Sequence, residues 1–155
     1  MTTLEQLREI LRAEGEPLAG ALRPVPLGET LLGPVAAGGP RAARDRAAYA
    51  LLLEAIYEGY LLHYERSRLL ASSDPNLALL AGDRLYALGL ERLVALGDLE
   101  AVRELADVIA ICALLHARGE GASCQALWLA GARAVGYGAS EEHERTKAAL
   151  REGSH

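Results

Sequence analysis

The stretch at positions 44–70, RDRAAYALLLEAIYEGYLLHYERSRLL, constrains the fold most, because it has the pattern of one long apolar helix. It contains no proline and a single glycine, Gly59. At ~1.5 Å per residue, such a helix would be about 40 Å long, so we expect the rest of the chain to pack around it. Residues at the three- and four-residue steps of one helix face are Tyr49, Leu52, Leu53, Ile56, Tyr60 and His63.

Composition favours helices throughout the chain. Hydrophobic residues make up 51% and charged residues 24% of 155 residues, enough for a globular core. Leucine and alanine dominate, phenylalanine is absent, and no window alternates apolar and polar residues for long enough to indicate a sheet. The predicted fold is therefore an all-α bundle of five or six helices in a single domain, 1–152. We expect residues 153–155 to be the remnant of an expression tag.

Residues 16–40 differ from the rest of the chain. They hold five of the six prolines and five glycines, which excludes a continuous helix. Their leucines and valines make them too apolar for a free linker. We predict a packed, irregular segment with one or two short helical turns, near 29–34, that covers the open end of the bundle or forms a lid over a site.

Capping signals set the expected helix boundaries. Thr3 and Gln6 have capping-box spacing and predict the start of a first helix. Asp74 followed by Pro75 predicts another start. The turn at 97–98 is so short that the helices on either side of it should lie antiparallel. The helices predicted after the long one span 75–96, 99–118, 124–135 and 141–152.

Charge and cysteine usage exclude several classes of protein. The net charge is −5 and no basic stripe is visible, so we expect no nucleic-acid partner. The longest apolar run, 108–117, is too short to span a bilayer, so we expect no membrane insertion. The first turn is polar and acidic, so we expect no signal peptide. Cys112 and Cys124 lack metal or redox spacing and are expected in the core of a cytoplasmic protein.

Carboxylates on the long stretch are the main candidates for chemistry. Glu54 and Glu58 lie four residues apart, and Glu65 returns to the same face two turns beyond Glu58. Like charges at this spacing repel one another, so a buried pair needs a partner. One reading is a site for a cation or an acid–base pair. The other is a solvated or arginine-paired face, for which the available partners are Arg84, Arg92 and Arg103.

The predicted helix 75–96 carries two further features. Asp83 lies on a face with Leu79, Tyr86 and Leu90, so we expect a buried carboxylate paired with an arginine or a tyrosine hydroxyl. Gly82 and Gly89, seven residues apart, would let another helix approach closely. Neither metal-binding histidine pairs nor glycine-rich phosphate loops occur, so we expect no metal and no cofactor.

Two stretches resemble a known family. The sequence LLAGDRLYAL at 79–88 resembles the LLAGD helix of the trans-isoprenyl diphosphate synthases. The sequence LLHYERS at 61–67 resembles the helix end where that family carries LxHDDxxD. The similarity covers about 41–128, and it implies a truncated isoprenoid synthase fold. It also implies a homodimer through residues 76–118, a region that is apolar over more than one helix stripe.

The chain departs from the family at the residues that matter for its chemistry. Tyr64, Glu65 and Ser67 stand where the family has aspartates that hold magnesium and diphosphate, and no Asp-Asp pair occurs anywhere. Because a diphosphate is held by several carboxylates bridged by Mg²⁺, the departure argues against prenyl transfer.

Two functional hypotheses follow from these features. The first is a non-catalytic, dimeric interaction or regulatory module, with an apolar pocket for a small molecule. The alternative is an enzyme acting on an apolar or terpenoid-like substrate through a polar site around Glu54, Glu58 and His63. The candidate ligand-binding residues are Glu54, Glu58, His63, Glu65 and Asp83.

Overall fold

The structure is a computed structural model that describes residues 1–153, and within them it contains helices and no strands. The all-α prediction is confirmed. The helices are α1 (Thr3–Ala13), α2 (Leu18–Ala21), α3 (Gly33–Ala37), α4 (Arg46–Tyr64), α5 (Pro75–Leu96), α6 (Leu99–Ala117), α7 (Cys124–Tyr137) and α8 (Glu141–Glu152), with 3₁₀ turns η1 (Pro40–Ala42) and η2 (Gly121–Ser123). The eight α-helices of residues 1–153 exceed the predicted five or six, because α2 and α3 are short helices inside 16–40. Ser154 and His155, part of the expected tag remnant, lie outside the described residues.

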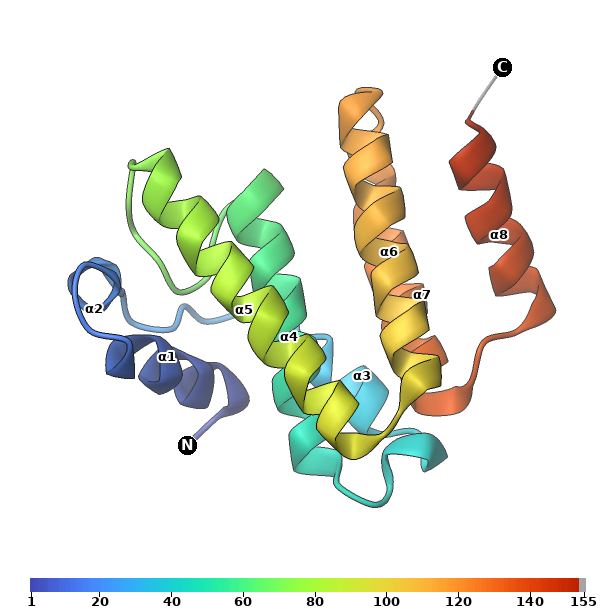
Figure 1. Cartoon of the computed structure of the whole chain (residues 1–155), viewed down its shortest axis with the longest axis horizontal. Helices are drawn as coiled ribbons and strands as arrows, with labels where there is room; N and C mark the ends of the chain where they lie inside the picture. The colour runs from blue at the N-terminus through green and yellow to red at the C-terminus, as the bar shows by residue number, and fades with distance from the viewer. Residues whose placement is uncertain (154–155) are drawn as a thin grey trace.

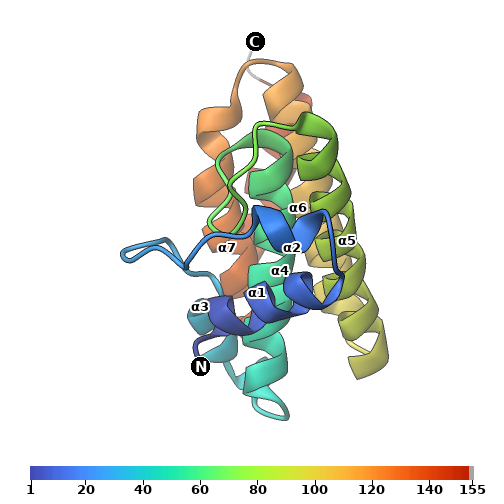
Figure 2. The same cartoon turned by 90° about the vertical axis from the view of Figure 1, so that its left-hand side faces the viewer.

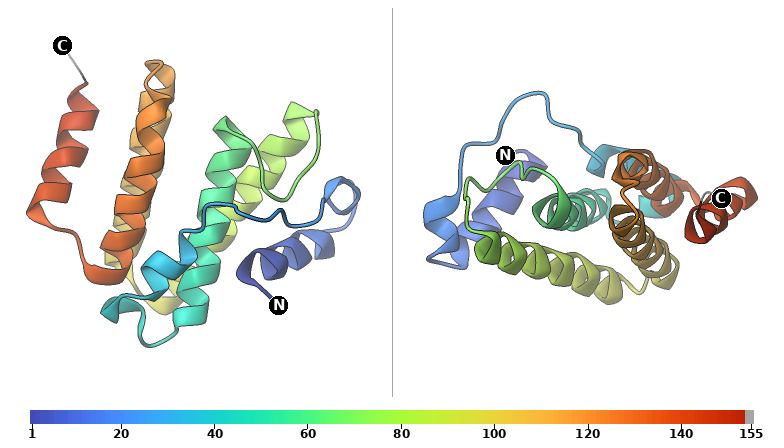
Figure 3. Two further views of the ribbon diagram at one scale, coloured as in Figure 1. Left: turned by 180° about the vertical axis from the view of Figure 1, so that it is seen from behind. Right: turned by 90° about the horizontal axis from the view of Figure 1, so that it is seen from above.

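Helix α4 is the centre of the structure, as the sequence predicts. Its residues are buried without a break from Leu51 to Leu62. A helix that is apolar all round must be covered all round, and Figure 3 shows α4 surrounded by other helices and by the irregular segments that connect them. One apolar cluster joins α4 to α3, α6 and α7, and a second joins it to α1 and α5. The helix ends at Tyr64, earlier than the predicted stretch, and residues 65–70 turn back along it.

Glycines allow α5 to lie close against α4. A Cβ atom built on Gly89 would come within 2.3 Å of Ile56 Cγ1, and one on Gly59 within 3.0 Å of the Gly82 carbonyl oxygen. Only glycine leaves room for this approach. The close packing predicted for Gly82 and Gly89 is therefore present, and it lies within one chain.

Helices α5 and α6 form one outer layer of the molecule, and α4 and α7 lie behind them (Figures 1 and 3). The turn between α5 and α6 uses Gly97 in the left-handed region, with φ 71°, and Asp98 as the N-cap of α6. The two helices run in opposite directions, as expected, but they diverge from this turn (Figure 1).

The N-terminal part of the chain covers one side of α4 and α5 (Figure 2). The Thr2 hydroxyl accepts a hydrogen bond from the Glu5 amide, and the Glu5 carboxylate accepts one from the Thr2 amide. The predicted capping box at Thr3 and Gln6 is therefore wrong by one residue. The segment 16–40 is packed and irregular with two short helices, as predicted, but these lie at 18–21 and 33–37 rather than near 29–34.

Candidate functional site

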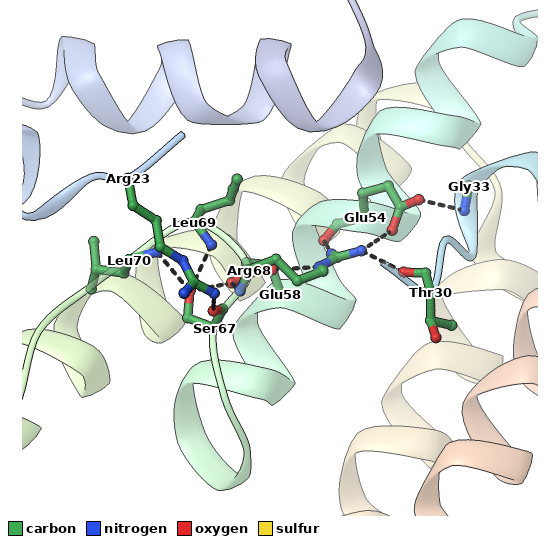
Figure 4. Close-up of polar contacts among 9 residues, drawn as sticks. All are labelled: Arg23, Thr30, Gly33, Glu54, Glu58, Ser67, Arg68, Leu69 and Leu70. Atoms are coloured by element: carbon green, nitrogen blue, oxygen red, sulfur yellow. Dashed lines mark hydrogen bonds and ion pairs between the residues drawn. The ribbon is translucent and has the colours of Figure 1, made fainter. Parts of the chain in front are cut away.

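A buried ion cluster joins the two central glutamates of α4. Arg68 lies between Glu54 and Glu58, and its side chain is 2% exposed while both carboxylates are 0% exposed. Arg68 Nη1 lies 3.0 Å from Glu54 Oε1, and Arg68 Nε lies 2.7 Å from Glu58 Oε1 (Figure 4). The two carboxylates therefore share one guanidinium, which is the arginine-paired reading of the sequence.

The remaining oxygen atoms of the cluster are also hydrogen-bonded. Glu58 Oε2 accepts from the Arg68 amide at 3.0 Å and from the Ser67 hydroxyl. Glu54 Oε2 accepts from the Gly33 amide at 3.0 Å, and Arg68 Nη1 donates to the Thr30 carbonyl at 2.9 Å. The cluster thus ties α4 to two irregular segments, 65–70 and 30–33 (Figure 4).

Electrostatics keep Arg68 charged in this position. Burial by itself would lower the pKa of its guanidinium, but the charges and hydrogen bonds of Glu58 and Glu54 outweigh burial and raise that pKa. A buried charge is tolerated when it is both paired and hydrogen-bonded. The arrangement has the properties of a structural ion cluster.

The arginine that pairs with these glutamates differs from the ones expected. Arg84 instead donates to Glu14, at 2.5 Å from its Nη2 to Oε1. Sequence reasoning missed Arg68 because it lies ten residues after Glu58, beyond the reach of a helix face, and contacts it only because the helix ends at Tyr64. That early end had no glycine or proline signal in the sequence.

His63 and Asp83 meet at the outer surface of the α4–α5 pair. His63 Nε2 lies 3.1 Å from Asp83 Oδ1, its Nδ1 lies 2.7 Å from the Gly59 carbonyl oxygen, and its ring stacks on Tyr86 with centroids 5.0 Å apart. The Asp83 side chain is 74% exposed. The expectation of a buried Asp83 is therefore wrong, because its helix position points outward from the α4–α5 contact.

Glu65 lies in a third environment, beside aromatic rings. Its Oε1 is 3.5 Å from the Tyr60 hydroxyl and 3.9 Å from His116 Nε2, and its side chain is 49% exposed. The Tyr60 hydroxyl and His116 Nε2 are 2.7 Å apart, and Tyr64 stacks on His116 at 4.4 Å. The structure thus brings Glu54 together with Glu58, and His63 together with Asp83, but it does not join all five candidates in one site.

A second buried ion network, which the sequence reasoning did not find, fixes α8 to α6. Lys147 is the single lysine of the chain and its side chain is 1% exposed. Its Nζ lies 3.0 Å from Glu104, 2.9 Å from Asp107 and 3.0 Å from Glu144. Burial alone would lower the pKa of Lys147, but the hydrogen bonds that it donates to the three carboxylates outweigh burial and raise that pKa. The one hint of this network in the sequence was that Lys147 is a lysine whereas the other Lys and Arg positions are all arginine.

Asp98 forms a third network at the start of α6. Its Oδ1 accepts from Arg41 Nη2 at 2.8 Å, and its Oδ2 accepts from the Tyr49 hydroxyl at 2.6 Å. Burial would raise the pKa of Asp98, but these hydrogen bonds outweigh burial and lower it. The N-cap of α6 is therefore tied to both α4 and η1.

The two cysteines are buried and unbonded to each other, as the sequence predicts. Cys124 Sγ lies 3.9 Å from the Cys112 carbonyl oxygen. Burial raises the pKa of the Cys112 thiol, which keeps it protonated and unreactive.

The described part of the chain was searched for metal-binding groups and for membrane-spanning helices. In residues 1–153, no group of three or more histidine, cysteine, aspartate or glutamate side chains is arranged to hold a metal ion. None of the helices there has the length and apolar character needed to cross a membrane.

Comparisons with known proteins give no match to any family model, curated protein or solved structure. The resemblance to isoprenyl diphosphate synthases therefore stays a prediction.

The first prediction concerns Arg68. Replacement by methionine leaves two buried carboxylates without a cation, and we expect it to lower the free energy of unfolding by about 3–5 kcal/mol. Changing Glu54 and Glu58 to glutamine in the same protein should recover most of this loss. Chemical denaturation measures both, with the exposed neighbour change Arg66→Met as the control. A loss below about 1 kcal/mol for Arg68→Met would contradict the cluster's structural role.

The second prediction concerns pH. The lowered pKa of Asp98 stabilises the fold above its unfolded value of about 3.9, and this stabilisation is lost as pH falls through that value towards the folded pKa. The raised pKa of Lys147 stabilises the fold below about 10.4, and this is lost as pH rises beyond it.

We therefore expect the free energy of unfolding, measured in urea at each pH, to be flat between about pH 5 and 9 and to fall on both sides. Asp98→Asn should make the fall on the acid side smaller without removing it, because Asp107 also has a lowered pKa. At Asp107 too, burial is outweighed by the hydrogen bonds and charges of Lys147 and Arg151. Lys147→Met should make the fall on the alkaline side smaller. If the free energy of unfolding of Asp98→Asn fell at acid pH as much as that of the wild type, Asp98 would not contribute to the loss of stability in acid.

Proposed function

We propose that this protein is a non-catalytic helical interaction module that works as a homodimer through residues 76–118. The observation that carries the proposal is an accessible, mainly apolar face on α5 and α6, called here the α5–α6 face, whose apolar side chains on α5 are interrupted by the exposed Asp83. Its exposed or partly exposed members are Leu79, Leu80, Ala87, Leu90, Val94, Val102, Ala106, Ile109, Ala110 and Ala113.

The C-terminal half of α6 supports the proposal most strongly. Between 108 and 117, its accessible residues include alanines, a leucine and an isoleucine, and the only titratable one is His116. A solvent-facing helix surface normally carries charged residues. The alanines at 106, 110, 113 and 117 recur at helical steps, so a second helix could approach this surface closely.

Helix α5 adds large apolar side chains to the same outer layer. Leu80 is 51% exposed and Val94 is 61% exposed, which is costly for leucine and valine at a solvent surface. In residues 1–153 no further helix covers the outer side of the α5–α6 layer (Figure 3). A second copy of the chain, related by twofold symmetry, would cover the exposed apolar side chains of both helices with its own apolar face. This self-complementarity supports a homodimer over an unrelated partner.

The geometry does not favour the enzyme alternative around Glu54, Glu58 and His63. The two glutamates are occupied by Arg68, Ser67 and Gly33, so neither has an oxygen without a donor. A general acid or base must reach the proton that it transfers. His63 binds Asp83 instead of either glutamate.

We also propose that the fold is that of a shortened isoprenoid synthase. Its support is that the two stretches carrying the resemblance, 61–67 and 79–88, lie on paired helices and meet through His63 and Asp83.

An apolar cavity supports the ligand part of the first hypothesis. It has a volume of about 460 Å³ and lies between the start of α1 and the segment 25–34. Its apolar walls are formed by Leu4, Val25, Pro26, Leu27, Leu31 and Pro34. Glu5, Glu29 and Glu54 also line it, so its size and lining suit a small, largely apolar molecule with a polar group.

The third prediction tests the dimer. Sedimentation should show the wild type as a dimer at micromolar concentration. Val94→Glu and Ala110→Glu place charges in the proposed interface and should give folded monomers, since both positions are accessible in a single chain. Leu129→Glu, an accessible leucine on α7 outside the face, is the matched control and should remain a dimer. A monomeric wild type at this concentration would refute the proposal.

The fourth prediction tests the apolar cavity. An uncharged fluorescent apolar probe should bind the wild type saturably, and Leu31→Asp should weaken that binding about tenfold by placing a charge in the wall. Leu129→Asp should leave it unchanged. Equal binding by the wild type and Leu31→Asp would place the probe elsewhere.

A further inference from the structure

A polar cavity lies where α4 ends and the chain turns towards α5. Its volume is about 450 Å³. Its lining includes Arg23, Leu62, Arg66, Ser67, Leu70 and Ser72. The cavity is separate from the α5–α6 face and from the apolar cavity beside α1.

Arg23 brings a positive charge to the lining of this cavity. Its Nη2 donates to the Ser67 carbonyl, but its Nε is buried and has no acceptor within the described residues. None of the carboxylates in residues 1–153 forms an ion pair with Arg23.

Arg66 brings a second positive charge to the same cavity. Within residues 1–153 it makes no ion pair or side-chain hydrogen bond. The neighbouring Glu65 also lines the cavity, but its Oε1 lies near Tyr60 and His116. Glu58, which accepts from Ser67, is already neutralised by Arg68.

We propose that this cavity binds a small oxyanion of the phosphate class between the Arg23 and Arg66 guanidinium groups. Guanidinium groups present planar pairs of N–H donors that match phosphate oxygens. The negative charge of a phosphate balances two arginines of the cavity lining that have no carboxylate partner. Ser72 lines the same cavity, and its hydroxyl, which accepts from the Asp74 amide, can donate to an anion.

Calorimetric titration of the full-length chain with inorganic phosphate, at constant ionic strength, tests this proposal. We expect saturable binding of one phosphate per chain, and at least about tenfold weaker binding by Arg66→Gln, because a charge-assisted contact is lost. Arg66 is exposed, so this variant should fold. Arg23→Gln should also lose binding, and Arg92→Gln, an exposed arginine on α5 outside the cavity, is the matched control.

The anion series gives the second readout. Sulfate should compete with phosphate, whereas acetate, which offers fewer oxygens and less charge, should bind at least about tenfold more weakly. Acetate binding as tightly as phosphate would overturn the phosphate-class assignment. Absence of saturable phosphate binding, or an Arg66→Gln affinity equal to that of the wild type, would overturn the site itself.

Discussion

The fold depends on one buried interaction, the pairing of Arg68 with Glu54 and Glu58 inside the molecule. Two carboxylates on a fully covered helix would repel each other and be strongly disfavoured without a cation. Arg68 can reach them only because the chain leaves α4 at Tyr64 and turns back. The same guanidinium holds the Thr30 carbonyl, so the paired charges also fix the path of the 30–33 segment.

Around this centre, each peripheral helix is attached by a different physical means. Glycines let α5 lie against α4, whereas α8 is attached to α6 through Lys147 and its carboxylates. Asp98 joins the start of α6 to α4 through Tyr49. These attachments leave the outer surface of α5 and α6 uncovered, and that uncovered apolar surface is the basis of the proposed dimer.

The sequence predicted those parts of the structure that follow from local rules. The all-α class and the start of α5 at Pro75 follow from composition and capping, and both are confirmed. The contact of Gly89 with α4 follows from the spacing of small residues. Arg68 was missed because Glu58 and Glu54 precede it by 10 and 14 residues. Lys147 was missed because two of its three carboxylate partners, Glu104 and Asp107, lie on another helix. Asp83 was placed in the interior because an apolar stripe does not reveal which side of α5 faces α4.

The central functional claim is that a second copy of the chain covers the α5–α6 face. Native mass spectrometry of the untreated protein at micromolar concentration tests it most directly. Since one chain has a mass of 16.5 kDa, twice this value, about 33 kDa, is the mass that the account predicts. A spectrum dominated by the 16.5 kDa single chain at that concentration would contradict it.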